Sequence, residues 1–361
     1  MRPDFEVGGV EVVRGQRRTI ELDVGRLVTD TPLTMPVHVI RGHRDGPTLF
    51  VSAAVHGDEL NGVEIVRRLL KSSRLRSMRG TLLAVPVVNV FGFVNRSRYL
   101  PDRRDLNRSF PGSDKGSLAA RMAYLFLDEI VERADYGIDL HTGALQRSNL
   151  PQVRTTLDEA ANRELALAFG APLVLHSDLR DGSLREWCQE RNTPVLLYEG
   201  GEALRFNEIA IRTGVRGVLR VMEAIGMLRR RSRTRGAGPV QARESGWVRA
   251  PESGILREGL QLGQWVREGD RLAVIGDPMG ETDEAVVAPY DGLVIGAVTS
   301  PLVNEGDGLY HIARPTQPGD MAERVAGLMP EYDGPTDPAS YAGENPPVTG
   351  PDERGSSRAD D

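Results

Sequence analysis

Apolar and polar residues alternate through the first 45 residues of the chain, most clearly over residues 19–24 and 36–40. A period of two predicts short antiparallel strands with one buried face. Residues 48–55 and 81–88 are instead nearly continuous apolar runs. Runs of this length indicate strands buried on both faces of a sheet, as in parallel sheets that are covered by helices.

Helical and strand patterns alternate after the first buried run. The periodicity predicts helices over residues 60–71, 117–133, 158–169, 183–191 and 206–228, and strands over residues 136–140, 172–176 and 194–199. A long polar loop over residues 89–116 separates the second buried strand from the next helix. This alternation predicts an α/β fold with a mainly parallel or mixed sheet flanked by helices. In such sheets, ligands bind at the carboxyl ends of the strands.

The pattern changes after an arginine-rich segment at residues 229–236, which we interpret as an exposed linker rather than a nucleic-acid-binding patch. Short strand patterns and frequent glycines over residues 240–315 predict a smaller C-terminal all-β domain, a barrel or a sandwich. Residues 316–361 are rich in Pro, Gly, Asp, Glu and Ser, which predicts a disordered tail. We therefore expect an α/β catalytic domain over residues 1–235, followed by the β-rich domain and the tail.

Composition narrows the functional classes. The net charge of −6 argues against general affinity for nucleic acid or anionic membranes. Cys188 is the single cysteine, so a disulfide within the chain and a cysteine-cluster metal site are excluded. The first residues lack a signal-peptide pattern, and no apolar stretch approaches the roughly 18 residues needed to span a membrane. We therefore expect a cytoplasmic protein.

Candidate metal ligands stand at the ends of predicted strands. His56 and Glu59 are three residues apart just after the first buried strand, and His141 ends another strand. Two histidines and a glutamate are a zinc ligand set that leaves one position for water. Glu199 also ends a buried strand, and Asp139 is a candidate hydrogen-bond partner of a ligand. Taken singly, each histidine is more commonly structural, and a strand-end glutamate can merely cap a turn.

Five motifs, in this order, carry a family resemblance: His56-Gly57-Asp58-Glu59, Arg98-Tyr99, Asp105-Leu106-Asn107-Arg108-Ser109-Phe110, Asp139-Leu140-His141-Thr142-Gly143 and Glu199-Gly200-Gly201. Together they resemble the succinylglutamate desuccinylase/aspartoacylase family, which is related in fold to the zinc carboxypeptidases. The resemblance extends over roughly residues 45–315 and includes the β-rich region. A set of five ordered motifs is far more specific than any one of them.

The resemblance implies a role for each matching residue: His56, Glu59 and His141 bind one zinc ion per chain, Glu199 is the general base and then the general acid, Arg98 polarises the scissile carbonyl, and Asn107 and Arg108 bind a substrate carboxylate. The loop over residues 101–104 is longer than in aspartoacylase. Arg103 or Arg104 could therefore take over part of the role of Arg98. For Arg108, an ordinary ion pair is the alternative.

The β-rich region contains half-motifs similar to those of biotinyl and lipoyl carrier domains. Carriers attach their cofactor to a hairpin lysine, whereas Lys71 and Lys115, the two lysines of this chain, both precede residue 116. A carrier role is therefore excluded. We expect this region to cap the zinc site or to form a homo-oligomer contact, with Tyr290 as a candidate pocket residue.

These features lead to the prediction of a zinc-dependent hydrolase that cleaves the amide bond of a small-molecule N-acyl amino acid, with no nucleic-acid or membrane partner. The alternatives are a metallocarboxypeptidase acting on peptides or cell-wall fragments, and a non-catalytic metal-binding protein. The sequence leaves open the acyl group, the amino acid that carries it, the metal and the oligomeric state.

Overall fold

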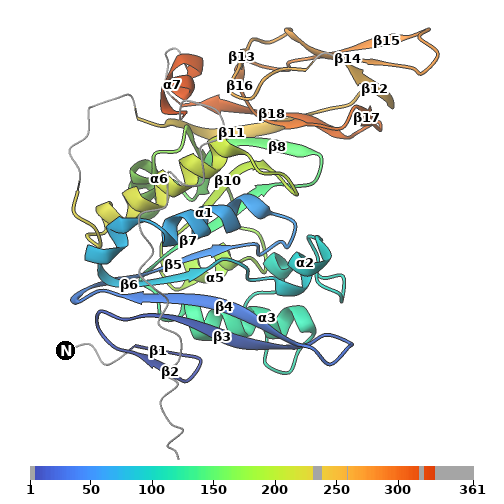
Figure 1. The fold of residues 1–361 in the computed structure, drawn as a ribbon. Coiled ribbons are helices and arrows are strands. Elements are labelled where there is room, and N and C mark those ends of the chain that lie inside the picture. The colour runs from blue at the N-terminus through green and yellow to red at the C-terminus, as the bar shows by residue number, and fades with distance from the viewer. Residues whose placement is uncertain (1–4, 231–237, 258, 317–320, 330–361) are drawn as a thin grey trace, which may run out of the picture.

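The structure is a computed structural model that describes residues 5–230, 238–257, 259–316 and 321–329. Within these residues, twelve strands form one mixed sheet in the order β13-β16-β18-β11-β9-β8-β10-β7-β5-β6-β4-β3 (Figure 1). The strands of this sheet are β3 (Arg17–Arg26), β4 (Pro32–Arg41), β5 (Arg44–Ala53), β6 (Arg79–Val85), β7 (Tyr136–Gly143), β8 (Arg147–Thr155), β9 (Leu173–His176), β10 (Val195–Glu202), β11 (Val240–Arg249), β13 (Trp265–Val266), β16 (Gly292–Val298) and β18 (Gly308–Pro315). A short hairpin of β1 (Phe5–Val7) and β2 (Val10–Val12) precedes it.

Helices cover both faces of this sheet (Figure 1). The helices are α1 (Leu60–Leu70), α2 (Val90–Asn95), α3 (Leu118–Phe126), α4 (Ala160–Phe169), α5 (Leu184–Glu190), α6 (Glu208–Ala224) and α7 (Met321–Leu328), with shorter turns η1 (Ser73–Ser77), η2 (Leu106–Arg108) and η3 (Leu127–Val131). Side chains of α1, α4 and α6 form one apolar core with the central strands. Side chains of α3 and α5 form a second core with β3, β4 and the first hairpin. The predicted mixed sheet with flanking helices is confirmed.

The central strands supply the edge at which the site lies. β6, β5, β7 and β10 run parallel to one another and are nearly fully buried, as continuous apolar runs require. β10 then pairs antiparallel with β8, and β8 pairs parallel with β9. Loops that leave the carboxyl ends of β5, β7 and β10 therefore meet at one edge of the sheet.

The C-terminal region consists mainly of strands, as predicted, and it continues the main sheet. β11 pairs with β9, and β16 pairs with β8. A separate four-stranded sheet, shown at the top of Figure 1, contains β12 (Gly254–Arg257), β14 (Arg271–Gly276), β15 (Asp283–Val287) and β17 (Leu302–Val303). These strands enclose an apolar core of their own with β16 and β18. The division at residues 235–240 stays a prediction, because the main sheet runs across it.

Three segments differ from the sequence-based expectations. β8 was not predicted, and the polar loop at residues 89–116 contains α2 and η2. α7 lies within the predicted disordered tail, and its Met321 and Val325 side chains are buried against β11 and neighbouring strands. The rest of that tail after residue 329 and most of the arginine-rich segment lie outside the described residues. Among the described residues, no helix has the length and apolarity that a membrane crossing requires.

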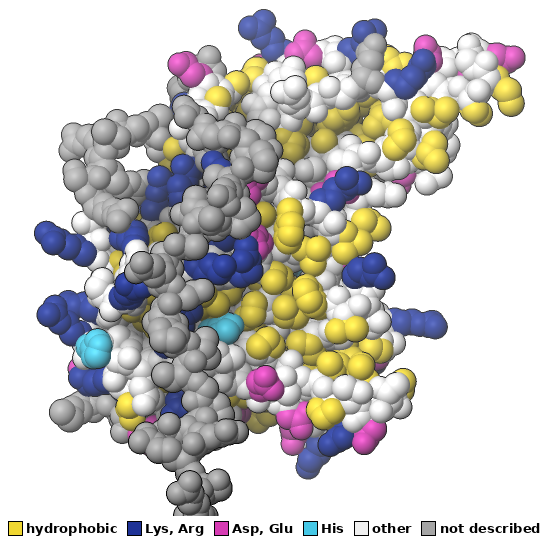
Figure 2. Space-filling model, in the orientation of Figure 1, with side chains coloured by type: hydrophobic (Ala, Val, Ile, Leu, Met, Phe, Trp, Pro, Cys, Tyr) yellow, Lys and Arg dark blue, Asp and Glu magenta, His cyan; other side chains and the backbone are white. Residues whose placement is uncertain are grey.

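The face of the molecule in Figure 2 shows Lys and Arg side chains around the rim and left of centre, and hydrophobic side chains gathered to the right of centre and over the C-terminal strands. Several large apolar side chains are exposed, among them Leu204, Phe206 and Leu302. Nothing in the structure indicates what covers them, and homo-oligomer formation stays a prediction.

Candidate metal and substrate site

The order of the strands brings the predicted site residues together. His56 follows β5, His141 lies in β7, and Glu199 lies in β10 directly beside His141 in the register of the two strands. Gly57 permits the turn after β5 to pass close to α2, because a Cβ atom there would lie 2.0 Å from the carbonyl carbon of Gly92. Strand ends and a tight turn thus place the three side chains at one edge of the sheet.

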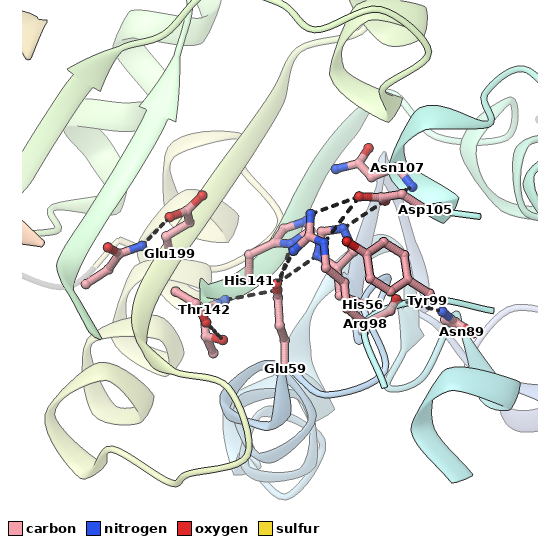
Figure 3. A network of polar contacts seen from close by, with 12 residues as sticks. His56, Glu59, Asn89, Arg98, Tyr99, Asp105, Asn107, His141, Thr142 and Glu199 are labelled. Atoms are coloured by element: carbon pink, nitrogen blue, oxygen red, sulfur yellow. Dashed lines mark hydrogen bonds and ion pairs between the residues drawn. The ribbon is translucent and has the colours of Figure 1, made fainter. Parts of the chain in front are cut away.

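His56, Glu59 and His141 form a buried cluster (Figure 3). The carboxylate of Glu59 lies between the two imidazoles, with Oε1 2.7 Å from His56 Nδ1 and Oε2 2.8 Å from His141 Nδ1. The candidate ligand atoms of the three residues all lie within 4.8 Å of one another, and the ring centroids are 5.0 Å apart. One divalent ion can bridge atoms at these separations. The backbone N–H of Thr142 also donates to Glu59 Oε2, over 3.1 Å.

A second carboxylate contacts each imidazole from its other side. Asp105 Oδ1 lies 3.1 Å from His56 Nε2, and Asp139 Oδ2 lies 2.7 Å from His141 Nε2. With Nε2 donating to these carboxylates, Nδ1 of each ring is left to bind a metal. This arrangement supports the prediction that Asp139 orients a ligand. Asp105 belongs to one of the five motifs, but no pattern in the sequence indicates its contact with His56.

Neighbouring charges favour the ionised form of each residue of the cluster and outweigh the opposing effect of burial. Burial opposes charge on Glu59, but the two adjacent imidazoles outweigh it and hold the pKa of Glu59 far below its ordinary value. Burial likewise opposes charge on His141, but Asp139 and Glu59 raise its pKa well above the ordinary value. The pKa of His56 is raised in the same way by Glu59 and Asp105. Each imidazole thus faces two carboxylates.

The loop between β6 and α3 supplies the predicted polar residues. The Arg98 guanidinium lies 2.9 Å from Asp105 Oδ2 and 3.4 Å from Glu59 Oε1, beside the cluster (Figure 3). The side-chain oxygen of Asn107 accepts a hydrogen bond from the backbone N–H of Leu184 over 3.0 Å, which holds the loop against α5. The amide nitrogen of Asn107 is therefore the atom left to contact a ligand.

Arg108 has no carboxylate partner among the described residues, which argues against the ordinary ion pair that was its alternative. Its guanidinium donates to the carbonyl of Asn107 over 2.5 Å, and burial together with nearby Arg98 and Arg180 lowers its pKa. Arg104 is exposed and faces Asp102 at the surface, and Arg103 does not line the cavity either. The structure therefore gives no support to the expectation that either takes over part of the role of Arg98.

All seven predicted site residues line one cavity of about 300 Å³. The cavity wall also includes four residues that the sequence analysis did not single out: Asn149, Arg154, Arg185 and Trp247. Asn149 and Arg154 lie on the unpredicted strand β8. Arg185 lies in α5 and Trp247 in β11, and neither position belongs to a motif that signals a site.

Arg185 presents an almost unpaired positive charge to the cavity. Its guanidinium donates to the carbonyl of Ser177 over 2.7 Å, and among the described residues no carboxylate lies within ion-pair distance of it. Burial and the nearby Arg154 lower the pKa of Arg185 to about 10, so it stays charged at neutral pH. A partly buried cation without an anionic partner is suited to bind an anionic group of a ligand.

The C-terminal strands contribute Trp247 to the cavity wall. Its indole stacks on His311 at a centroid distance of 4.8 Å, and the guanidinium of Arg147 lies 5.1 Å from the centre of the indole ring. Tyr290, the residue suggested from the sequence, does not line the cavity, and its hydroxyl donates to the carbonyl of Ile312 over 3.2 Å. The C-terminal region thus reaches the site through Trp247.

Several known proteins are similar to this chain in sequence or in fold. The N-alpha-acetyl-L-2,4-diaminobutyric acid deacetylase of Halomonas elongata is 27% identical over 327 residues, which are 86% of this chain and 93% of that protein. A succinylglutamate desuccinylase/aspartoacylase structure from Rhodobacter sphaeroides superposes with a TM-score of 0.74 at 25% identity, covering 84% of this chain and 96% of that one. The product-bound ectoine utilization protein EutE of Ruegeria pomeroyi shares the fold, with a TM-score of 0.74 at 24% identity over 82% of this chain and 94% of its own.

The model of the succinylglutamate desuccinylase/aspartoacylase catalytic domain matches residues 45–225, half of the chain. This segment contains every residue of the His56–Glu59–His141 cluster and also Glu199. The resemblance carried by the five motifs is therefore confirmed, and the chain belongs to the succinylglutamate desuccinylase/aspartoacylase family.

Proposed function

We propose that this chain is a zinc-dependent hydrolase that cleaves the amide bond of a small N-acyl amino acid. The observation that carries the proposal is the buried His56–Glu59–His141 cluster, which shares one cavity with Glu199 and several arginines. The cavity volume of about 300 Å³ suits a small substrate better than a peptide. The deacetylase activity named for the Halomonas relative supports the same class of reaction.

The donor set fits a single zinc ion. Two imidazole nitrogens and one carboxylate oxygen are the ligands of many catalytic zinc sites, and each imidazole is oriented by a second carboxylate. His56, Glu59 and His141 would hold the ion. A bound zinc ion would supply Lewis acidity, which polarises a carbonyl and makes a water molecule more acidic.

Glu199 is the residue that moves the proton in this proposal. Its carboxylate takes a proton from the attacking water and later delivers it to the departing nitrogen, which would otherwise leave poorly. Its place beside His141 in the sheet supports this role. Arg98 lies next to the cluster, where its guanidinium can stabilise charge that develops on the carbonyl oxygen. One such donor is commonly worth about 3 kcal/mol.

Arginines that line the same cavity bind the carboxylate of the substrate. Arg108 and Arg185 have no carboxylate partner among the described residues, and a guanidinium binds a carboxylate through two parallel hydrogen bonds. The free amide nitrogen of Asn107 adds a neutral donor near Arg108. These contacts fix the amino-acid part of the substrate while the amide lies beside the cluster.

The test is a hydrolysis screen with zinc-loaded protein against N-acetyl and N-succinyl derivatives of aspartate, glutamate and 2,4-diaminobutyrate. We expect turnover of at least one derivative, loss on removal of the metal by a chelator, and recovery on addition of zinc. The Glu199→Gln variant should keep its zinc and lose turnover by about 100-fold or more. Activity that removal of the metal by a chelator does not reduce, or full activity of the Glu199→Gln variant, would refute the proposal. The cytoplasmic location also stays a prediction.

A further inference from the structure

We propose that Asn149 and Arg154 on β8 are positioning residues for Glu199: they hold one oxygen of its carboxylate so that the other faces the cavity. The inference rests on the proposed function, in which Glu199 moves the proton. To that role it adds the residues that orient the Glu199 side chain and the carboxylate oxygen that transfers the proton.

Two donors converge on one atom of Glu199. The amide nitrogen of Asn149 lies 2.5 Å from Glu199 Oε2, and Nη2 of Arg154 lies 3.1 Å from the same oxygen. Among the described residues, nothing donates to Oε1. Glu199 is also the sole carboxylate that lies within ion-pair distance of Arg154 in the described part of the chain. The oxygen left for proton transfer is therefore Oε1.

The pairing of the strands explains why these two residues meet Glu199. In the antiparallel ladder of β8 and β10, Arg154 lies opposite Leu197, and Asn149 lies opposite Gly201. Leu197, Glu199 and Gly201 stand at every second position of β10 and therefore lie on the same face of the sheet. Their partners Arg154 and Asn149 lie on the neighbouring strand, one on either side of Glu199 along its length. A register shift between Glu199 and Gly201 brings Asn149 closer along the strand.

A glutamate side chain turns about three torsion angles, so an unrestrained carboxylate spends much of its time in unproductive orientations. One hydrogen bond to Oε2 from Asn149 and one ion pair with Arg154 limit this freedom before the substrate binds. Asn149 is itself buried, so its own orientation is restricted. The pair thus acts through Glu199.

The C-terminal strand β16 contacts Asn149 from the side, as the neighbour of β8 in the sheet. Gly296 in β16 pairs with Asn149, and a Cβ atom at Gly296 would lie 3.0 Å from the side-chain oxygen of Asn149 and 3.1 Å from the Cβ of His311. These contacts are tight, so the Gly296→Ala variant would push on Asn149. Through Gly296 and Asn149 the β-rich region can affect the orientation of Glu199. This link is independent of Trp247, which the same region contributes to the cavity wall.

The test compares the Asn149→Ala, Arg154→Met and Arg154→Lys variants of the full chain, with the panel derivative that is cleaved fastest as substrate. Because misplacement of a catalytic group costs about 10- to 100-fold, we expect kcat to fall by that factor in the first two variants while KM stays within about twofold. Arg154→Lys should recover part of the loss, because a lysine keeps the charge. Arg243→Met is the matched control, since Arg243 pairs with Asp158 at the surface and should leave kcat unchanged.

The same substitutions in the Glu199→Gln background separate positioning from a general structural effect. If Asn149 and Arg154 act through Glu199, their removal should cost little once Glu199 no longer moves protons. Zinc content and the thermal midpoint of every variant are measured in parallel. An undiminished kcat in the single variants, or an equal loss in both backgrounds, would overturn the inference. Full activity of the Glu199→Gln variant alone would instead refute the role proposed for Glu199.

Discussion

The substitution Asp139→Asn tests whether the carboxylate behind His141 governs metal binding. Asp139 is fully buried, accepts from His141 Nε2 over 2.7 Å, and accepts from the Ser52 hydroxyl through its other oxygen, also over 2.7 Å. Asparagine keeps the shape of the side chain and one oxygen for the imidazole, and Ser52 can turn its hydroxyl to accept from the new amide. The variant therefore removes the charge and little else.

The size of the effect follows from these contacts. Loss of a hydrogen-bond partner behind a metal ligand typically costs 10- to 100-fold in metal affinity, or about 1.4 to 2.8 kcal/mol. Because Asp139→Asn keeps an acceptor for His141, we expect about a tenfold loss of zinc affinity, near the lower limit of that range. Asp139→Ala also removes the acceptor and leaves the imidazole N–H buried without a partner. It should approach a loss of about 100-fold.

Competition with a chromophoric chelator at fixed pH measures these affinities directly. Ser52→Ala is the control, because it removes one hydrogen bond to Asp139 but leaves the negative charge beside His141. We expect it to lose less affinity than Asp139→Asn. Unchanged zinc affinity in Asp139→Asn, or an equal loss in Ser52→Ala, would refute the reasoning that the charge of Asp139 acts on the metal through His141.

Three further outcomes are expected. Arg185→Met should raise KM by about 10-fold or more and leave zinc affinity unchanged, because a charged hydrogen bond to substrate is worth about 1.5 kcal/mol or more. Steady-state kinetics measure the change in KM, and an unchanged KM would contradict this expectation. Because neighbouring carboxylates raise the pKa of His141 in the metal-free protein, zinc must displace a proton, and apparent affinity should fall as pH falls below that pKa; calorimetry in buffers of different ionisation enthalpy detects the released proton. Gly217→Ala would place a methyl group 2.1 Å from the Phe169 ring, so the free energy of unfolding in urea should fall by about 1–3 kcal/mol, whereas Gly238→Ala should change it little.

The predicted metal cluster could be found from the sequence because its geometry follows from local rules. His56 and His141 each stand at the end of an apolar run, and the carboxyl ends of parallel strands meet at one edge of a sheet. Glu59 follows His56 by three residues, so one turn of chain brings it to the same point. Strand order predicts that these residues meet, and the resemblance carried by the five motifs identified them as metal ligands.

β8 shows where this reasoning failed. Its sequence places Asn149, Pro151, Gln152 and Arg154 within a few residues, a pattern that argues against a central strand because proline lacks a ladder donor and polar side chains are costly to bury. The structure places Pro151 between the paired residues Asn149 and Gln152, at the irregularity of the ladder with β10. The polar side chains of Asn149 and Arg154 are accommodated because they face Glu199 and the cavity.

Residues on the substrate side were harder to predict because distant chain segments bring them to the cavity. Arg185 comes from α5 and Trp247 from β11, and neither position has a local pattern that distinguishes it from an ordinary surface or core residue. Trp247 reaches the cavity because β11 pairs with β9, and Gly296 reaches Asn149 because β16 pairs with β8. The main sheet is thus continuous from the metal cluster to the C-terminal strands. A change in the C-terminal strands can therefore alter both the shape of the cavity and the orientation of Glu199, while the metal cluster on β5 and β7 remains intact.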